Sequence, residues 1–372
     1  MMKLSKVLFL FTFFSAPILA QEFIALNEEN WDFDAKAFVL EHYKGKDAIY
    51  IQQGSITLKD VEFLDGTIEL DVFLTERQGF PGVGFRQFDD ENEESFYLRP
   101  HLSGMPDANQ TAPTVNGLSA WQLYFGERYS FAYDYNFDDW THVKLLVNGD
   151  TAQVFMDYSE TPQLTWKLKH EPRAGKVNFG GSFAPMHFAN IKITQEKPEL
   201  MDFVLPETKP LDGVIQRWHI SDKFLETRLE HPGQPAALIA ERQWPHSVEI
   251  EENNAANISW AVSRRQQEGN TVFARLTIDA AFDQVKLFEF GYSDRVVAIL
   301  NGKPIYRGTN KWRSRDYRYL GTIGFFDAIY LDLKEGRNTL LLAVSEDFGG
   351  WGVTGRFADS KGIKIGLNQE TE

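Results

Sequence analysis

Cysteine is absent from the 372-residue chain, so no disulfide contributes to its stability. Each domain must be stabilised by the burial of side chains alone. Acidic residues outnumber basic ones, 53 against 38, which gives a formal net charge of −15. Such an acidic surface argues against nucleic acids and anionic lipids as partners and is best matched by a neutral ligand. No apolar run after residue 20 is long enough to cross a membrane, so no membrane insertion is expected.

The first 20 residues have the pattern of a secretory signal peptide. Lys3 and Lys6 precede an apolar run from Val7 to Phe14, and small residues follow as far as Ala20. A membrane anchor is the alternative, but the run is short for a bilayer span and no lipid-attachment cysteine follows it. We expect cleavage after Ala20 and export to the periplasm or exterior of a bacterium. The loss of two lysines would change the formal charge from −15 to −17.

Residues that favour strands and turns dominate the rest of the chain. Aromatic residues make up 14% of the sequence, alongside 28 Gly and 15 Pro. Many short segments alternate apolar and polar residues with period two, which is typical of half-buried strands. Asn148-Gly149 and Asn301-Gly302 each predict a tight hairpin. The sequence therefore predicts an all-β protein, with helix limited to a turn or two in loops.

Length and one break in the strand pattern predict two domains. The chain is too long for one ordinary sandwich. Residues 197–212 interrupt the alternation with three prolines and several acids. We expect a signal peptide (1–20), a first β-sandwich (21–196), a linker (197–212) and a second β-sandwich (213–372).

Three segments of the first sandwich predict a binding face. ESFYLRPH (94–101), GVGFRQF (82–88) and SAWQLYFG (119–126) are expected as strands of one sheet. Their apolar side is expected to comprise Phe85, Phe96, Leu98, Trp121 and Leu123. Their polar side is expected to comprise Arg86, Tyr97, Arg99, His101, Gln122 and Tyr124. Sugars bind to such mixtures, because their rings stack on Tyr while Arg, Gln and His bond their hydroxyls. The alternative is an ordinary solvated sheet face with cross-strand pairs.

The connection from 102 to 118 is expected to contain no regular element. It is interpreted either as a binding loop beside this face, with Asp107, Asn109 and Gln110 as hydrogen-bonding groups, or as a plain surface excursion.

The order of the segments from GTIELDVF (66–73) to HFANIKI (187–193) resembles the concanavalin A-like lectin/glucanase fold, in its laminin-G-like branch. It is also similar to the sandwich domain of 3-keto-disaccharide hydrolases. The resemblance implies a jelly roll with a glycan on its concave face, but not catalysis. ELDVFLTE (69–76) resembles the carboxylate strand of laminarinase-type glucanases. Phe73 stands where the third carboxylate belongs, and Glu76 has the wrong parity, so we interpret this strand as structural.

A second enzymatic interpretation uses Arg99, His101, Gln122 and Tyr124. Their types resemble those of jelly-roll polysaccharide lyases such as alginate lyase, where Arg and Gln neutralise a uronate and His or Tyr transfers the proton. The diagnostic lyase motifs do not occur in order, and the acidic surface disfavours a polyanion.

The second half carries its own resemblance. LNGKPIY (300–306) and LDLKEGRN (331–338) resemble the galactose-binding-like jelly roll found in many bacterial glycan-active proteins. Such domains either bind sugars through loops or brace a neighbour. The arginine-rich segment around Trp312 is either a second glycan contact or an ion-paired hairpin. In the segment Phe348–Trp351, Trp351 is expected either as an exposed ring that a ligand can stack on or as a core residue.

Neither a cofactor nor a metal site is expected from the motifs. The histidines lack ligand spacing, and no nucleophile elbow occurs. A structural calcium ion in the loop FDDENEE (88–94) remains an alternative.

The leading hypothesis is an exported carbohydrate-binding or accessory protein that recognises a polysaccharide or oligosaccharide, with no catalytic residue assigned. The alternatives are a glycan-cleaving enzyme, either a glycoside hydrolase or a polysaccharide lyase, on the same face, and a structural module that holds envelope partners.

Overall fold

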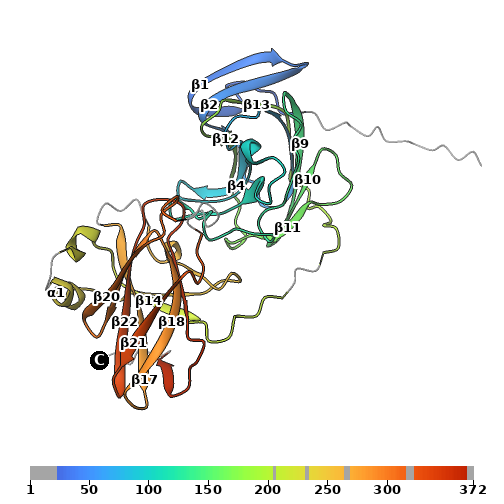
Figure 1. Ribbon diagram of the computed structural model, residues 1–372. Coiled ribbons are helices and arrows are strands. Elements are labelled where there is room, and N and C mark those ends of the chain that lie inside the picture. Colours follow the sequence, from blue (N-terminus) through green and yellow to red (C-terminus); the bar gives the residue numbers. More distant parts are fainter. Residues whose placement is uncertain (1–22, 204–206, 231–233, 264–268, 316–321, 367–372) are drawn as a thin grey trace, which may run out of the picture.

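The computed structural model describes residues 23–203, 207–230, 234–263, 269–315 and 322–366 (Figure 1). The expected signal peptide lies outside them. Strands make up nearly all the regular structure, which confirms the all-β prediction. Within the described ranges, helix is confined to α1 (Gln234–Ala240) and to three short 3-10 turns, η1 (Pro100–Leu102), η2 (Glu226–Leu229) and η3 (Ile258–Trp260). No helix in these ranges is long and apolar enough to span a bilayer.

The first sandwich is one antiparallel sheet folded into two layers. Its strands are β1 (Trp31–Tyr43), β2 (Lys46–Leu58), β3 (Gly66–Leu74), β4 (Gly82–Asp89), β5 (Asn92–Leu98), β6 (Asn109–Thr111), β7 (Thr114–Val115), β8 (Leu118–Ser119), β9 (Asp139–Asn148), β10 (Thr151–Met156), β11 (Leu164–Lys167), β12 (Lys176–Gly181) and β13 (Met186–Thr194). β2 belongs to both layers, because residues 48–51 pair with β13 and residues 54–57 pair with β12. One layer runs β11-β10-β9-β3-β13 and the other β12-β4-β5-β7-β8.

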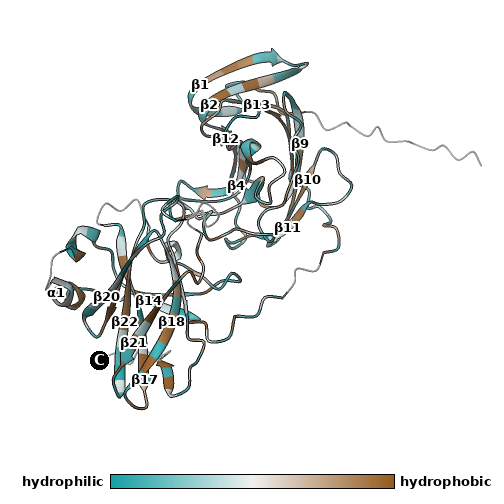
Figure 2. Cartoon of the chain, viewed as in Figure 1, coloured by the Kyte–Doolittle hydropathy of each residue, from teal (hydrophilic) through white to brown (hydrophobic). Residues whose placement is uncertain are grey.

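Alternation along the strands builds the core of this sandwich. Leu70 and Val72 of β3 face Phe85 of β4 and Phe96 of β5 within a single buried cluster. The other residues of β3, namely 69, 71 and 73, therefore lie on the outer face of their layer. Figure 2 shows apolar and polar residues alternating in bands along the strands.

The two predicted hairpins form, with one difference in the turn. Asn301 (φ 48°) and Gly302 (φ 79°) both adopt the left-handed backbone between β19 (Arg295–Leu300) and β20 (Lys303–Thr309), as a type I′ turn requires. In the first sandwich Asn148 still pairs with Thr151, so the turn is centred on Gly149-Asp150. Of that pair only Gly149 has a positive φ, at 61°.

The second sandwich packs a larger sheet on a smaller one. Its strands are β14 (Arg217–Ile220), β15 (His246–Glu249), β16 (Ala256–Asn257), β17 (Thr271–Ala280), β18 (Gln284–Ser293), β19 (Arg295–Leu300), β20 (Lys303–Thr309), β21 (Asp327–Leu333), β22 (Gly336–Ser345), β23 (Gly352–Arg356) and β24 (Ile363–Gly366). The sheets run β15-β14-β17-β22-β19-β20, with β24 beside β17, and β16-β23-β18-β21. Their facing residues form a second core, and α1 contributes Leu238 to a third cluster on the outer side of the larger sheet.

The stretch between the sandwiches contains no regular element in its described residues, 195–203 and 207–216. It is nevertheless tied to the first sandwich, because Gln153 of β10 exchanges two hydrogen bonds with the backbone of Met201. Asn148 also donates to the carbonyl of Pro198.

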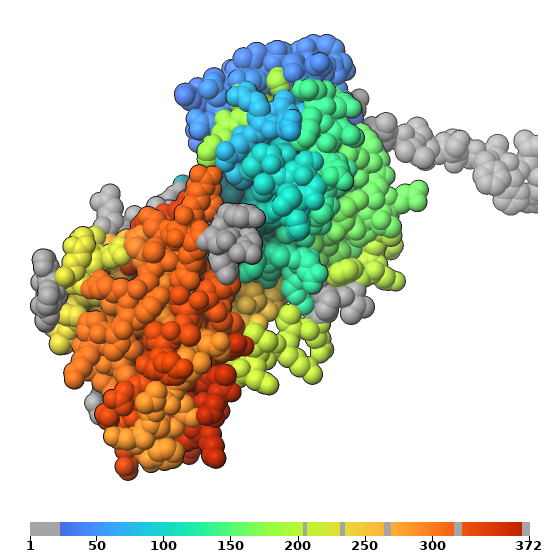
Figure 3. Space-filling model, in the orientation of Figure 1, coloured from blue at the N-terminus to red at the C-terminus, as the bar shows by residue number. Residues whose placement is uncertain are grey.

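The two sandwiches touch directly, as Figure 3 shows. The amide of Gln122 donates to the carbonyl of Gly349 (2.9 Å), and Asn253 donates to the carbonyl of Leu123 (2.7 Å). Gly349 lies so close to Gln122 that an added Cβ would be 2.3 Å from its side-chain oxygen. The FGGW motif therefore joins the two sandwiches, because glycine, which lacks a Cβ, permits this close approach of the two segments.

A buried carboxyl joins β5 to the segment that follows β11. Glu94 is 1% exposed, and its Oε1 accepts the amides of Lys169 and His170, both at 2.7 Å. Burial raises the pKa of Glu94 from 4.5 to about 7, because the two amide donors offset only part of the desolvation of the charged form.

Gly349→Ala should destabilise the contact between the sandwiches. The new Cβ meets Gln122 at a backbone φ of 103°, so strain and overpacking add to about 3 kcal/mol. Gly302→Ala is the matched control: it also has a positive φ, but nothing lies within 4 Å of its Cβ, so it should cost only about 1 kcal/mol. Calorimetry should show the larger fall in Tm for Gly349→Ala. Equal shifts would contradict the docking role of Gly349.

Glu94→Gln should remove one component of the pH dependence of stability. Between pH 4.5 and about 7 the folded protein keeps the Glu94 proton that the unfolded chain loses, so the free energy of unfolding falls as the pH rises. The loss amounts to at most about 3 kcal/mol. Urea unfolding across this window should show a flatter profile for Glu94→Gln than for the unsubstituted chain. Parallel profiles would refute the raised pKa.

Candidate functional site

The structure corrects the predicted position of Arg86. Arg86 is 1% exposed, and the adjacent Phe85 is also buried. A register shift in the pairing of β4 with β5 and a φ of 51° at Arg86 interrupt the alternation, which turns the guanidinium inward. It donates to the carbonyls of Leu64 and Gly149, both at 2.7 Å, and to Asp65 at 3.1 Å. Arg86 therefore joins two loops and is not available to a ligand.

Gln122 and Tyr124 also lie inside the protein. Segment 119–126 was expected as a strand, but beyond β8 it forms turns. Both side chains are 0% exposed because they meet the second sandwich. Gln122 accepts a hydrogen bond from Ser293 (2.9 Å), and the Tyr124 hydroxyl donates to Glu251 (2.8 Å). The expectation that they share an open face with the other four residues is wrong.

Tyr97, Arg99 and His101 remain neighbours at the end of β5. Arg99, 6% exposed, donates to the Tyr97 hydroxyl (3.0 Å) and to the side-chain oxygen of Gln110. Tyr97 donates to the same oxygen (2.9 Å). The amide of Gln110 in turn donates to the carbonyl of Trp121 (2.8 Å). This network of Tyr97, Arg99 and Gln110 holds segment 121–124 in place. A glycan contact through Tyr97, Arg99 and His101 stays a prediction.

The connection 102–118 is more regular than expected. It contains β6, β7 and the start of β8. Asn109 and Gln110 are buried and bond to neighbouring segments, Asn109 to the backbone of Phe131 and Gln110 to the carbonyl of Trp121. Asp107 lies 3.6 Å from Arg99 at the surface.

A different surface of the first sandwich concentrates rings and charges. It is the outer face of the layer around β3, and we call it the β3 face. Its members are Tyr43, Lys46, Glu69, Asp71, Phe73, Trp140, His142, Tyr158, His187 and Lys192. Phe73 lies on the same face as Glu69 and Asp71, as the parity of ELDVFLTE predicted.

Asp71 is the polar centre of the β3 face. Only 1% exposed, it accepts hydrogen bonds from Nδ1 of His142 (2.8 Å), Nζ of Lys46 (2.7 Å) and Nδ2 of Asn190 (2.6 Å). Burial by itself raises the pKa of Asp71, but these three hydrogen bonds outweigh it and hold the pKa below its usual value. Asp71 therefore stays ionised and fixes the orientation of the imidazole.

His142 lies between two carboxylates and beneath an exposed ring. Its Nε2 is 3.7 Å from Glu69, and Tyr158 stacks on it with ring centroids 4.0 Å apart and planes 7° apart. Tyr158 is 73% exposed, yet it and Asp157 have φ of 61° and 47°, a conformation that bulky residues rarely adopt. Asp157 holds it there by accepting the amide of His142 (2.9 Å).

Aromatic rings line the other end of the β3 face. Tyr43 stacks on His187 at 3.8 Å, and Phe73 lies edge-on to both Tyr43 (5.0 Å) and Trp140 (5.5 Å). The hairpin that joins β1 and β2 covers this end, because Trp140 donates to the carbonyl of Lys44 (3.1 Å). Half-buried rings beside hydrogen-bonding groups can stack on a sugar and bond its hydroxyls.

The members of the β3 face come from strands far apart in the chain, so no single segment of the sequence predicts it. One signal was available. DWTHVK alternates Trp140, His142 and Lys144 on one side, as ELDVF alternates Glu69, Asp71 and Phe73. Two strands that place charges and rings on the same parity predict a shared polar-aromatic face once they are paired, and β9 does pair with β3.

A groove of about 340 Å³ runs along β15 in the second sandwich. Glu251 and Trp260 line it, and the Trp260 indole donates to Glu251 (2.9 Å). Burial raises the pKa of Glu251. The same carboxylate accepts from Tyr124, so its role is accounted for by the contact between the sandwiches.

The two candidate tryptophans of the second sandwich differ in exposure: Trp351 is buried and Trp312 is exposed. Trp351 is a core residue, 1% exposed, that donates to the carbonyl of Val344. Trp312 is 40% exposed, with the Arg313 guanidinium 4.1 Å from its ring. Arg315 is ion-paired with Asp327, as expected of a hairpin. Tyr317 and Arg318 lie outside the described residues.

No group of three or more potential metal-ligating side chains occurs in the described part of the chain. In the loop 88–94, Asp89 accepts the amide of Glu91 (2.8 Å) and the side chain of Asn92 (2.9 Å). A calcium ion there stays a prediction.

No family model and no curated protein matches the chain. Solved structures resemble parts of it. A putative glycosyl hydrolase from Parabacteroides distasonis is 13% identical, over 45% of this chain and 89% of that one, with a TM-score of 0.32. The carbohydrate binding module CBM66 from Bacillus subtilis is 14% identical (39% and 85%, TM-score 0.32), and the galectin LEC-6 from Caenorhabditis elegans is 10% identical (46% and 99%, TM-score 0.28). At these scores the likenesses carry no argument about this chain.

Asp71→Asn should destabilise the protein and should reduce the fall in its stability at acid pH. The substitution leaves Lys46 and His142 without their anion, which costs about 3 kcal/mol. The stability that Asp71 contributes is fully present above the unfolded pKa, about 3.9, and is lost as the pH falls through the lower folded pKa. Thermal unfolding at neutral and acid pH measures both effects. Asp47→Asn, at a side chain 96% exposed, should leave Tm unchanged. Similar Tm values for the two variants would rule out this role of Asp71.

Proposed function

We propose that this protein is an exported carbohydrate-binding or accessory protein and that its β3 face holds a neutral glycan. The proposal of export rests on the signal-peptide pattern of residues 1–20. The proposal of glycan binding rests on the β3 face.

The observation that carries the proposal is the position of Tyr158. The left-handed backbone of Tyr158 costs free energy, and because its ring is exposed, burial of the side chain does not offset this cost. The surrounding structure nevertheless fixes the ring, through the hydrogen bonds of Asp157 and the stack on His142. A rigid exposed ring next to a carboxylate, Glu69, and a lysine, Lys192, is suited to stack on a pyranose and to bond its hydroxyls.

The charges of the β3 face favour a neutral ligand. Lys192 lies 3.7 Å from Glu69, and Lys46 is paired with Asp71. Lys192 and Lys46 therefore each have an anion beside them, and a charged ligand would have to displace a partner that is already in place. A neutral sugar can bond to both members of such a pair at once.

Two observations favour binding over cleavage. Both carboxylate oxygens of Asp71 are occupied, and its side chain is 2% exposed, so it is poorly placed to attack a glycosidic bond. The position of the third carboxylate is filled by Phe73. A retaining mechanism needs two available carboxyl groups about 5 Å apart across the bond. A glycoside hydrolase or polysaccharide lyase remains the alternative, and release of reducing ends or unsaturated products from a glycan would support it.

Tyr158→Ala should weaken glycan binding about tenfold, the equivalent of one lost stacking contact. Affinity electrophoresis through gels that contain neutral glucans, mannans, galactans or xylans measures the effect. Tyr330→Ala is the matched control, because Tyr330 is 74% exposed on β21, away from the β3 face.

The unsubstituted protein and Tyr330→Ala should be retarded alike by at least one of these polymers. Retention of Tyr158→Ala to the same degree would contradict the site. Failure of the unsubstituted protein to bind any of them would contradict the function and favour the structural module.

A further inference from the structure

Three aromatic rings gather where the two sandwiches meet. Trp121 comes from the first sandwich, Phe348 from the loop after β22, and Trp312 from the segment after β20. Phe348 lies between the other two, with ring centroids 5.9 Å from Trp121 and 6.3 Å from Trp312. Phe348 is 53% and Trp312 40% exposed. The plane of the Phe348 ring is inclined by 62° to that of Trp121 and by 54° to that of Trp312, so the three rings form one cluster without being coplanar.

The protein fixes this surface at a cost. The carboxylate of Asp294 is 1% exposed and accepts the amides of Asp347 (2.8 Å) and Phe348 (2.9 Å). Burial raises the pKa of Asp294, because it desolvates the ionised form. On the other side, the amide of Gln122 holds the carbonyl of Gly349. The buried carboxylate of Asp294 thus fixes the backbone of Phe348, whose apolar ring is exposed to water. Stability alone does not explain this arrangement.

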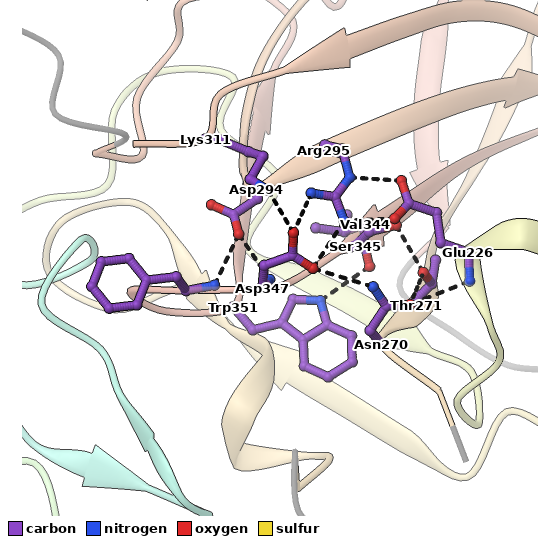
Figure 4. Close-up of polar contacts among 11 residues, drawn as sticks. Glu226, Asn270, Thr271, Asp294, Arg295, Lys311, Val344, Ser345, Asp347 and Trp351 are labelled. Carbon is purple, nitrogen blue, oxygen red and sulfur yellow. Dashed lines mark hydrogen bonds and ion pairs between the residues drawn. The ribbon is translucent and has the colours of Figure 1, made fainter. Parts of the chain in front are cut away.

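The charges beneath the rings cancel. Arg295 bonds to both oxygens of Glu226 and both oxygens of Asp347, and Lys311 bonds to Asp347 at 2.7 Å. Figure 4 shows how Arg295 and Lys311 converge on Asp347 beside Asp294. Arg295 and Lys311 are thus paired with Glu226 and Asp347, while the Asp294 carboxyl accepts backbone amides and the Arg313 guanidinium lies over Trp312. The surface therefore suits a ligand with apolar ring faces, polar edges and no charge.

We propose that Trp121, Trp312 and Phe348 form a second carbohydrate-binding site, separate from the β3 face, which takes a neutral pyranose chain and is complete only while the two sandwiches are docked. Successive sugar rings stack on the tilted aromatic rings, and the Arg313 guanidinium over Trp312 bonds their hydroxyls. The inference shares the class of ligand with the proposed function but none of its residues.

Calorimetric titration of the full chain with neutral gluco-, manno-, galacto- and xylo-oligosaccharides tests the second site. The unsubstituted chain should bind two equivalents of one of these probes. Phe348→Ala and Trp312→Ala should each retain one equivalent at the original affinity, because the altered site binds about tenfold more weakly, and so should Tyr158→Ala. Phe282→Ala is the control, since Phe282 is 56% exposed on the turn between β17 and β18, and it should still bind two.

The same variants on a gel that contains the matching polysaccharide should show the loss of avidity. With either site removed, retention should fall at least tenfold, because the second contact is no longer intramolecular. Gly349→Ala should behave like Phe348→Ala if docking completes the site.

The outcomes separate the two claims. Two equivalents bound by both Phe348→Ala and Trp312→Ala would overturn the inference and leave the proposed function standing. Unchanged stoichiometry in Tyr158→Ala, with all binding lost in Phe348→Ala, would overturn the β3 face as a glycan-binding site and support the inference. No binding of any probe by the unsubstituted chain would overturn both.

Discussion

The close approach of residues 120–124 to the Gly349-Gly350 loop is the constraint on which the rest of the structure depends. Both glycines face atoms of the first sandwich at distances that leave no room for a Cβ. The approach buries Gln122 and Tyr124 against the second sandwich and places Trp121 beside Phe348. Because polar groups on both sides are bonded across the contact, separating the sandwiches would leave several of them unsatisfied. The two sandwiches therefore act as one body.

The β3 face depends on a buried charge whose hydrogen-bond partners all lie within the first sandwich. Its centre, Asp71, is buried but satisfied by three donors, so charge is retained there without an unpaired group. That fixed charge orients His142, which supports the exposed ring of Tyr158. At the second aromatic site the buried acid is Asp294, and it supports Phe348 through the backbone. In both places a desolvated carboxylate holds an aromatic ring at the surface.

The sequence predicted what local rules determine and missed what the contact between the sandwiches determines. The alternation in ELDVF correctly placed Phe73 beside Asp71, and Asn301-Gly302 correctly predicted a type I′ turn. Parity failed at Arg86, where a register shift turned the side chain inward. It failed again at 119–126, because that segment pairs with no neighbouring strand beyond β8 and packs on the second sandwich instead. The residue pattern of one segment does not show whether a domain formed by later residues will cover that segment.

Amide hydrogen exchange at Gln122 tests the central claim most directly. Its amide lies in a turn but donates to Gly349 across the contact. If the sandwiches are docked in solution, this amide should exchange as slowly as the core amides of β9 and β3. Exchange at the rate of an exposed turn would show that the contact opens freely, and the burial of Gln122 and the composite aromatic surface would both be contradicted.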